Sequence, residues 1–143
     1  MVAHILKVNM KKLFRLFLFT IGIVLTSAIF STSVFASPSS YTELEFIQLQ
    51  KEGKSILVVV HAPWCPTCRA QTPIIDELLS ENEFKEITAL RVDFDSQKYS
   101  LKKFNVSKQS TLILFKGGRE VARSTGDTSL WNIEKLLKKL PKS

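Results

Sequence analysis

The sequence predicts one α/β domain, in which helices cover both faces of a mixed sheet of about four strands. The first observation behind this prediction is a set of short apolar runs rich in β-branched residues, which are typical of buried strands. They lie at residues 55–62, 88–94 and 111–116, with an antiparallel partner at 120–124. The second is a set of amphipathic segments typical of helices, at residues 42–51, 65–79, 99–104 and 128–140.

The first predicted helix carries a start signal and a stop signal. Thr42 and Glu45 fit a capping box, and Gly53 follows the last turn. Three apolar positions lie between these signals: Leu44, Ile47 and Leu49.

The centre of the chain is residues 55–69, where a buried strand leads into W-C-P-T-C and then into a helix. Cys65 falls at the helix N-terminus, where free backbone N–H groups and the helix dipole favour an anion. This lowers the thiol pKa, and the thiolate is the nucleophile. Cys68 lies one turn later, close enough to attack a mixed disulfide formed at Cys65. The helix is expected to kink at Pro73 and to face the sheet with Ile74, Ile75, Leu78 and Leu79.

The second half of the chain ends in a hairpin and a helix. Gly117 and Gly118 predict a tight turn between the last two strands. Asp127 or Thr128 is expected to cap the last helix. The inner face of that helix is predicted to consist of Leu130, Ile133, Leu136, Leu137 and Leu140.

Residues 1–36 are predicted to be a secretory signal peptide, followed by the domain at residues 37–143. A basic start precedes an apolar core at residues 16–25 and a small-x-small cleavage pattern at residues 34–36. Met10 is an alternative start that shortens the leader. The other interpretation is an uncleaved membrane anchor, since residues 16–35 carry no charge and are long enough to span a bilayer. Both interpretations place the domain in the periplasm or another extracytoplasmic space.

The distribution of charge argues against nucleic-acid binding, and the number of cysteines favours redox chemistry over metal binding. The leader holds four of the 20 basic residues and none of the 13 acidic ones, so the rest of the chain is only weakly basic. Its charges are of mixed sign, and no nucleic-acid-binding surface is predicted. Cys65 and Cys68 are the only two cysteines. A metal site usually needs a second pair or histidines at fixed spacing, so these residues favour redox chemistry.

From about residue 41 to residue 140 the sequence resembles the thioredoxin family. The W-C-x-x-C motif, Pro73 eight residues after Cys65, the pattern of residues 87–115, the glycine turn and Gly126 all match family features. The resemblance implies a thioredoxin-like three-layer sandwich that acts as a thiol–disulfide oxidoreductase. The family often has a short strand before its first helix. Only residues 39–41 could supply it here, so this edge strand is expected to be missing.

The resemblance also implies roles around the cysteines. Trp64 is expected to shield the thiolate and to form part of the substrate surface. Pro66 and Thr67, between the cysteines, are expected to tune the redox potential. Arg69 and Arg91 match positions where the family often has lysine, and they either favour the thiolate or are solvated surface charges.

Three positions depart from the family pattern. Val59 replaces a buried carboxylate that moves the second cysteine's proton, so this shuttle is absent. His61 replaces an aromatic residue and is either a general base or cation, or a packed neutral imidazole. Ser110, preceded by Gln109, replaces a cis-proline in the loop that binds substrate backbone and keeps metals off the thiols. A non-proline cis bond costs about 3 kcal/mol, so this loop is expected to be trans or strained.

We therefore predict an exported thiol–disulfide oxidoreductase with Cys65 as nucleophile and Cys68 as resolving cysteine. It needs no bound organic cofactor. Its expected partners are cysteine-containing exported proteins and a membrane redox partner that recycles the dithiol, and a monomer is expected. The direction of electron flow stays open. Two alternatives stay open as well: a module that binds copper, zinc or an iron–sulfur cluster through Cys65, Cys68 and His61 or between two chains, and a non-catalytic binding domain.

Overall fold

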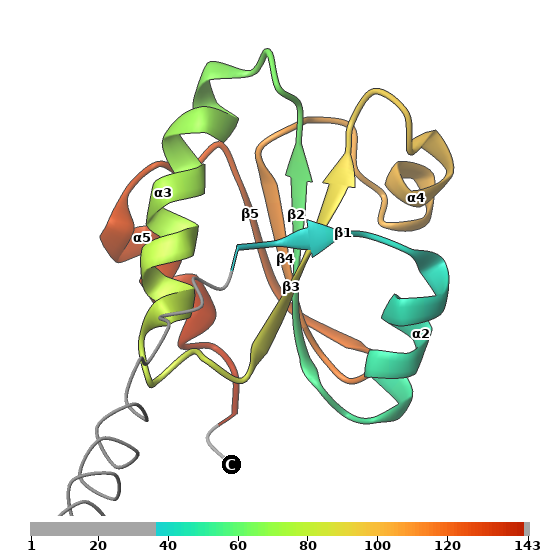
Figure 1. Ribbon diagram of the computed structural model, residues 1–143, viewed down its shortest axis with the longest axis vertical. Helices are drawn as coiled ribbons and strands as arrows, with labels where there is room; N and C mark the ends of the chain where they lie inside the picture. Colours follow the sequence, from blue (N-terminus) through green and yellow to red (C-terminus); the bar gives the residue numbers. More distant parts are fainter. Residues whose placement is uncertain (1–36, 142–143) are drawn as a thin grey trace, which may run out of the picture. The chain divides into compact units, whose positions relative to one another are not determined.

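A computed structural model describes residues 37–141 of the chain, which form a five-stranded sheet between two layers of helices (Figure 1). The strand order is β1-β3-β2-β4-β5. β1, β3 and β2 are parallel, whereas β4 is antiparallel to β2 and β5 to β4. The mixed α/β class is confirmed, with five strands instead of four. The strands are β1 (Ser39–Ser40), β2 (Ser55–His61), β3 (Ile87–Asp93), β4 (Thr111–Lys116) and β5 (Arg119–Thr125).

The fifth strand is β1, at the edge of the sheet. Ser39 and Ser40 pair with Leu90 and Arg91 of β3, and the N–H of Tyr41 donates to the carbonyl of Arg91 at 2.8 Å. The expectation that this strand is missing was therefore wrong. Two residues are enough because the next backbone N–H continues the pairing.

The helices lie in pairs on the two faces of the sheet (Figure 1). α3 (Pro66–Ser80) and α5 (Leu130–Leu137) cover one face, and α2 (Glu43–Lys51) and α4 (Lys98–Lys103) cover the other. Because side chains alternate along a strand, β2 sends residues to both cores. Leu57 and Val59 pack with α3 and α5, while Ile56, Val58 and Val60 pack with α2 and α4. β2 is therefore buried on both faces, as its apolar run predicts.

α2 begins as predicted, but its fully buried residue is not one of the three predicted apolar positions. The Thr42 hydroxyl accepts a hydrogen bond from the N–H of Glu45 at 3.3 Å. Leu44, however, is 82% exposed; Leu49 is partly buried against the core, and the fully buried residue of this helix is Phe46. The ring of Phe46 lies 5.1 Å from that of Phe104 and 5.2 Å from that of Phe115. This aromatic cluster fixes which side of α2 faces the sheet.

α5 is shorter than predicted at both ends. Its N-cap residue is Ser129, because Asp127 instead accepts hydrogen bonds from Asn132 and Gln71. Past Leu137, the N–H groups of residues 139 and 140 bond three residues back, which ends the helix. Of the predicted inner face, Leu130 is largely exposed, Leu140 is partly buried, and Ile133, Leu136 and Leu137 are buried.

Within residues 37–141, none of the helices combines the length and the apolar character needed to cross a bilayer. The predicted leader, with Met10 and its alternative as a membrane anchor, lies outside the described residues.

Candidate active site

The two cysteines lie where β2 passes into α3. Cys65 is the N-cap residue of α3, and its sulfur accepts a hydrogen bond from the N–H of Cys68 at 3.2 Å. Pro66 is the first residue of the helix, where its missing N–H costs nothing because that group has no partner within the helix. Thr67 follows it. α3 then continues through Pro73 to Ser80, so this proline does not stop the helix.

Both sulfurs contact one hydroxyl group. Cys65 and Cys68 are free thiols with side chains only 3% and 2% exposed. The Oγ of Ser110 lies 3.1 Å from the Sγ of Cys65 and 3.1 Å from the Sγ of Cys68. In each pair either atom can be the donor. The carbonyl of Val60 is a more distant acceptor, 3.9 Å from the Cys68 sulfur.

The two thiols have opposite tendencies to ionise. For Cys65, burial raises the pKa, but hydrogen bonds from Cys68, Ser110 and the backbone N–H groups outweigh it, so the pKa is lowered overall. For Cys68, burial and the hydrogen bond with Cys65 raise the pKa, although Ser110 acts in the opposite sense. Cys65 is therefore the thiol suited to act as nucleophile, and Cys68 retains its proton.

The Ser110 loop is held by backbone hydrogen bonds instead of a proline. No peptide bond among the described residues is cis, and Ser110 has φ +60°, in the left-handed region. Its N–H donates to the carbonyl of Val60 at 2.9 Å, and its carbonyl accepts from the N–H of Gly126 at 2.9 Å. The expectation of a trans or strained loop is confirmed. Gln109, the other candidate for substrate binding, precedes it and is half-buried.

Sequence reasoning missed Gln71, a buried residue one turn after Cys68. Its side-chain amide donates to the carbonyl of Ser110 at 3.3 Å and to the carbonyl of Asp127 at 2.7 Å. It thus ties α3 to the loops before β4 and α5. A polar residue on the buried side of an amphipathic helix was the signal that could have revealed it.

Trp64 lies on the surface beside Cys65. Its side chain is 54% exposed, and its Nε1 donates to the carboxylate of Asp95 at 2.7 Å. Asp95, in the loop after β3, was not singled out from the sequence. This bond fixes the indole next to the dithiol while leaving much of its surface open to solvent.

His61 and the nearby charges lie at the ends of β2 and β3. Burial and the positive charge of Arg91 lower the pKa of His61, and Asp93 opposes them. These shifts favour the neutral imidazole, and His61 has no hydrogen bond to either sulfur in the described part of the chain. Val59, in the place of the expected carboxylate, is buried among apolar residues.

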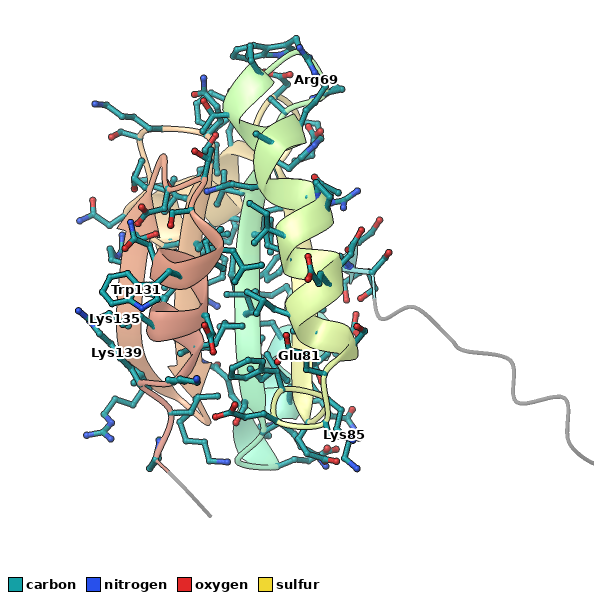
Figure 2. All side chains as sticks on the ribbon, turned by 90° about the vertical axis from the view of Figure 1, so that its left-hand side faces the viewer. Arg69, Glu81, Lys85, Trp131, Lys135 and Lys139 are labelled. Atoms are coloured by element: carbon teal, nitrogen blue, oxygen red, sulfur yellow. The ribbon has the colours of Figure 1, made fainter. Side chains whose placement is uncertain are left out.

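Arg69 marks the end of α3 that carries the cysteines (Figure 2). Its guanidinium donates to the carbonyl of Pro63 at 3.1 Å and is exposed, as a surface charge would be.

The three donors considered for a metal do not form a cluster. Among residues 37–141 there is no group of three or more His, Cys, Asp or Glu side chains placed to hold a metal ion. Cys65, Cys68 and His61 therefore do not make the three-ligand site that one alternative requires.

Comparisons with known proteins agree with this geometry. The Thioredoxin family model matches residues 38–139. Thioredoxin of Chlamydia trachomatis is 38% identical over 84 residues, which cover 59% of this chain and 80% of that protein. The crystal structure of Trxlp from Edwardsiella tarda is 40% identical, with a TM-score of 0.69, and covers 71% of this chain and 98% of that one. That of thioredoxin O2 from Arabidopsis thaliana is 27% identical, with a TM-score of 0.64, and covers 78% of this chain and all of that one.

The match to the family model spans the whole of the described sheet and its helices, and it includes the cysteine pair at the start of α3. Thioredoxins are thiol–disulfide oxidoreductases. With this fold, this site and these relatives together, the chain belongs to the thioredoxin family.

Proposed function

We propose that this thioredoxin-family protein is exported and exchanges disulfides with cysteine-containing exported proteins through the W-C-P-T-C dithiol. Cys65 forms the mixed disulfide with the substrate, and Cys68 resolves it. Trp64, Gln109 and Ser110 line the site where the substrate docks. A membrane redox partner returns the dithiol to its working state.

The observation that carries the assignment of roles is the position of Cys65 as the N-cap residue of α3. There its sulfur receives the N–H of Cys68 at 3.2 Å, so a thiolate at this position is stabilised before substrate arrives. Cys68 lies one turn further and is protonated, which suits a residue that attacks only after the mixed disulfide has formed.

The roles of the cysteines are tested by trapping the mixed disulfide. The Cys68→Ser variant should accumulate a covalent complex with a disulfide-bonded protein substrate, and the Cys65→Ser variant should not. If both single variants accumulate it equally, the assignment of nucleophile and resolving cysteine is wrong. If the wild type forms no reversible dithiol–disulfide couple in glutathione buffers, the proposed exchange is wrong as a whole.

Export rests on the pattern of residues 1–36, namely a basic start, an apolar core and a cleavage pattern. Full-length protein should appear outside the cytoplasm with its new N-terminus at Ser37. Retention of residues 1–36 on exported protein would favour the membrane anchor, and cytoplasmic protein would refute export. Equilibration with glutathione gives the direction of electron flow. A reduction potential of about −270 mV indicates a reductase, and one of about −120 mV indicates an oxidant.

A further inference from the structure

The Ser110 hydroxyl occupies the space between the two reactive sulfurs. It lies 3.1 Å from each of them, and Ser110 is 3% exposed. The distance from the Cys68 sulfur to its other acceptor, the carbonyl of Val60, is 3.9 Å. Of these two oxygens, the hydroxyl is the nearer to the Cys68 thiol.

The backbone of Ser110 holds this hydroxyl in place. Its N–H is bonded to Val60 in β2, and its carbonyl receives both the N–H of Gly126 and the amide of Gln71. Three separate parts of the fold thus fix one residue whose φ of +60° is unusual for a side-chain-bearing residue. Strained residues that are held this firmly by their surroundings cluster at active sites.

The site needs a group that can move a proton. Cys68 must lose its proton when it attacks the mixed disulfide, and burial opposes its ionisation. Val59, at the position where the family resemblance places a carboxylate, has no titratable group. His61, Asp93 and Asp95 lie at the ends of β2 and β3, and within residues 37–141 none of them is hydrogen bonded to either sulfur.

We propose that the Ser110 hydroxyl is a catalytic residue that relays the proton of Cys68 in the resolving step, a role that rests on the dithiol function proposed above. A hydroxyl can do this because it accepts one hydrogen bond while donating another. At 3.1 Å from each sulfur, the Ser110 hydroxyl is placed so that it can donate to the Cys65 thiolate and accept from the Cys68 thiol in the reduced protein.

The relay step balances without an added reductant. In the mixed disulfide, the Cys68 S–H gives its proton to the Ser110 oxygen, while the Ser110 O–H gives its own proton to the departing substrate sulfur. That sulfur is bonded to the sulfur of Cys65, which lies 3.1 Å from the Ser110 hydroxyl. The electron pair of the Cys68 sulfur forms the bond to Cys65, and the bond between Cys65 and the substrate breaks. The dithiol is oxidised to the disulfide, and the substrate leaves as a thiol.

The relay is tested by measuring the resolving step on its own with Ser110→Ala. The variant keeps the Cβ of Ser110 and removes only the hydroxyl. A mixed disulfide preformed at Cys65 is mixed with buffers of different pH, and release of the substrate thiol is followed in rapid mixing. At pH 7 the variant should release thiol at least about 100-fold more slowly than the wild type. The release rate of the variant should rise with pH. At a pH high enough for Cys68 to ionise without help, the release rates of the two proteins should converge.

Thr111→Val is the matched control. It deletes a buried hydroxyl from the next residue, one that bonds to Lys108 and Thr125 and has no hydrogen bond to either sulfur. It should keep the wild-type rate and pH profile.

Two other outcomes would contradict the relay. If Ser110→Ala slows release by the same factor at every pH, the hydroxyl has only a packing role. If it slows the first attack by Cys65 but not the release, the hydroxyl stabilises the thiolate and relays nothing. In both cases wild-type exchange still works, so the proposed function survives. The absence of exchange in the wild type would instead refute the proposed function.

Discussion

The side-chain amide of Gln71 donates a hydrogen bond to the backbone carbonyl of Ser110 at 3.3 Å. The same nitrogen lies 2.7 Å from the carbonyl of Asp127. One buried side chain on the active-site helix therefore supports the loop that carries the hydroxyl between the thiols. A loop that lacks the family's proline gains its rigidity from this amide and from the backbone bonds around it.

Replacing Gln71 with leucine should weaken the domain. The change keeps the approximate volume but leaves the carbonyl of Asp127 without this donor and that of Ser110 with one donor fewer. The free energy of unfolding should fall by about 1–2 kcal/mol, measured by urea unfolding of the reduced protein. Gln48→Leu is the control, because Gln48 is exposed and its side chain donates to Glu52, the C-cap residue of α2. Equal effects of the two changes would contradict a supporting role for Gln71.

Phe46→Ala should be among the most damaging changes on α2. Phe46 is 2% exposed and lies in an aromatic cluster with Tyr41, Phe104 and Phe115. Loss of its ring should lower the free energy of unfolding by about 3–5 kcal/mol. Leu44→Ala, on the exposed side of the same helix, should change it by less than about 0.5 kcal/mol. A larger effect at Leu44 would show that α2 packs by the face predicted from the sequence.

Ionisation of the thiols should make the stability of the reduced protein depend on pH. The pKa of Cys65 is lowered from the ordinary value of 9.0, so the folded state binds fewer protons than the unfolded one. Stability gained from this thiolate should grow as pH rises from the folded pKa toward 9.0 and be lost on acidification. Above that value the raised pKa of Cys68 should act in the opposite direction.

Urea unfolding across this pH range measures the effect, and the oxidised protein is its control. With a disulfide between Cys65 and Cys68, neither thiol can ionise, so the contribution should vanish. An identical pH dependence in the two redox states would rule out these thiols as its source.

Trp64→Ala should impair exchange with protein substrates more than with a small disulfide. An exposed indole beside the nucleophile offers apolar contact area to a polypeptide, and its loss should lower kcat/KM for a protein disulfide by about tenfold. Trp131→Ala is the control. Trp131 is also exposed, but it lies on α5, away from the end of α3 marked by Arg69 (Figure 2). Equal losses for both variants would contradict a docking role for Trp64.

The sequence was informative wherever a local pattern decides the structure. The apolar run of β2, the capping pair Thr42 and Glu45 and the cysteines at a helix start are all recognisable without neighbours, and the structure has each of them in place. Packing between segments that are distant in the sequence was harder to predict. Phe46 is buried because Phe104 and Phe115 meet it from elsewhere in the chain, and nothing within α2 indicates that.

The geometry of the candidate site depended on long-range contacts too. Ser110 was recognised as a departure from the family, but its distance to both sulfurs follows from bonds to Val60, Gly126 and Gln71. These residues come from three other segments. A single sequence shows which residue differs, and only the fold shows what the new side chain touches.

The bond between Trp64 and Asp95 also holds an indole next to the dithiol, where it can serve as an optical reporter. An indole held beside two thiols is quenched differently by a thiolate and by a disulfide. Its emission should therefore change when the pair is oxidised. The second tryptophan, Trp131, stacks under Lys135 on another helix, with its ring centre 4.7 Å from the ammonium nitrogen. Replacing Trp131 with phenylalanine would leave Trp64 as the one tryptophan, so that redox turnover could be followed in real time without a label.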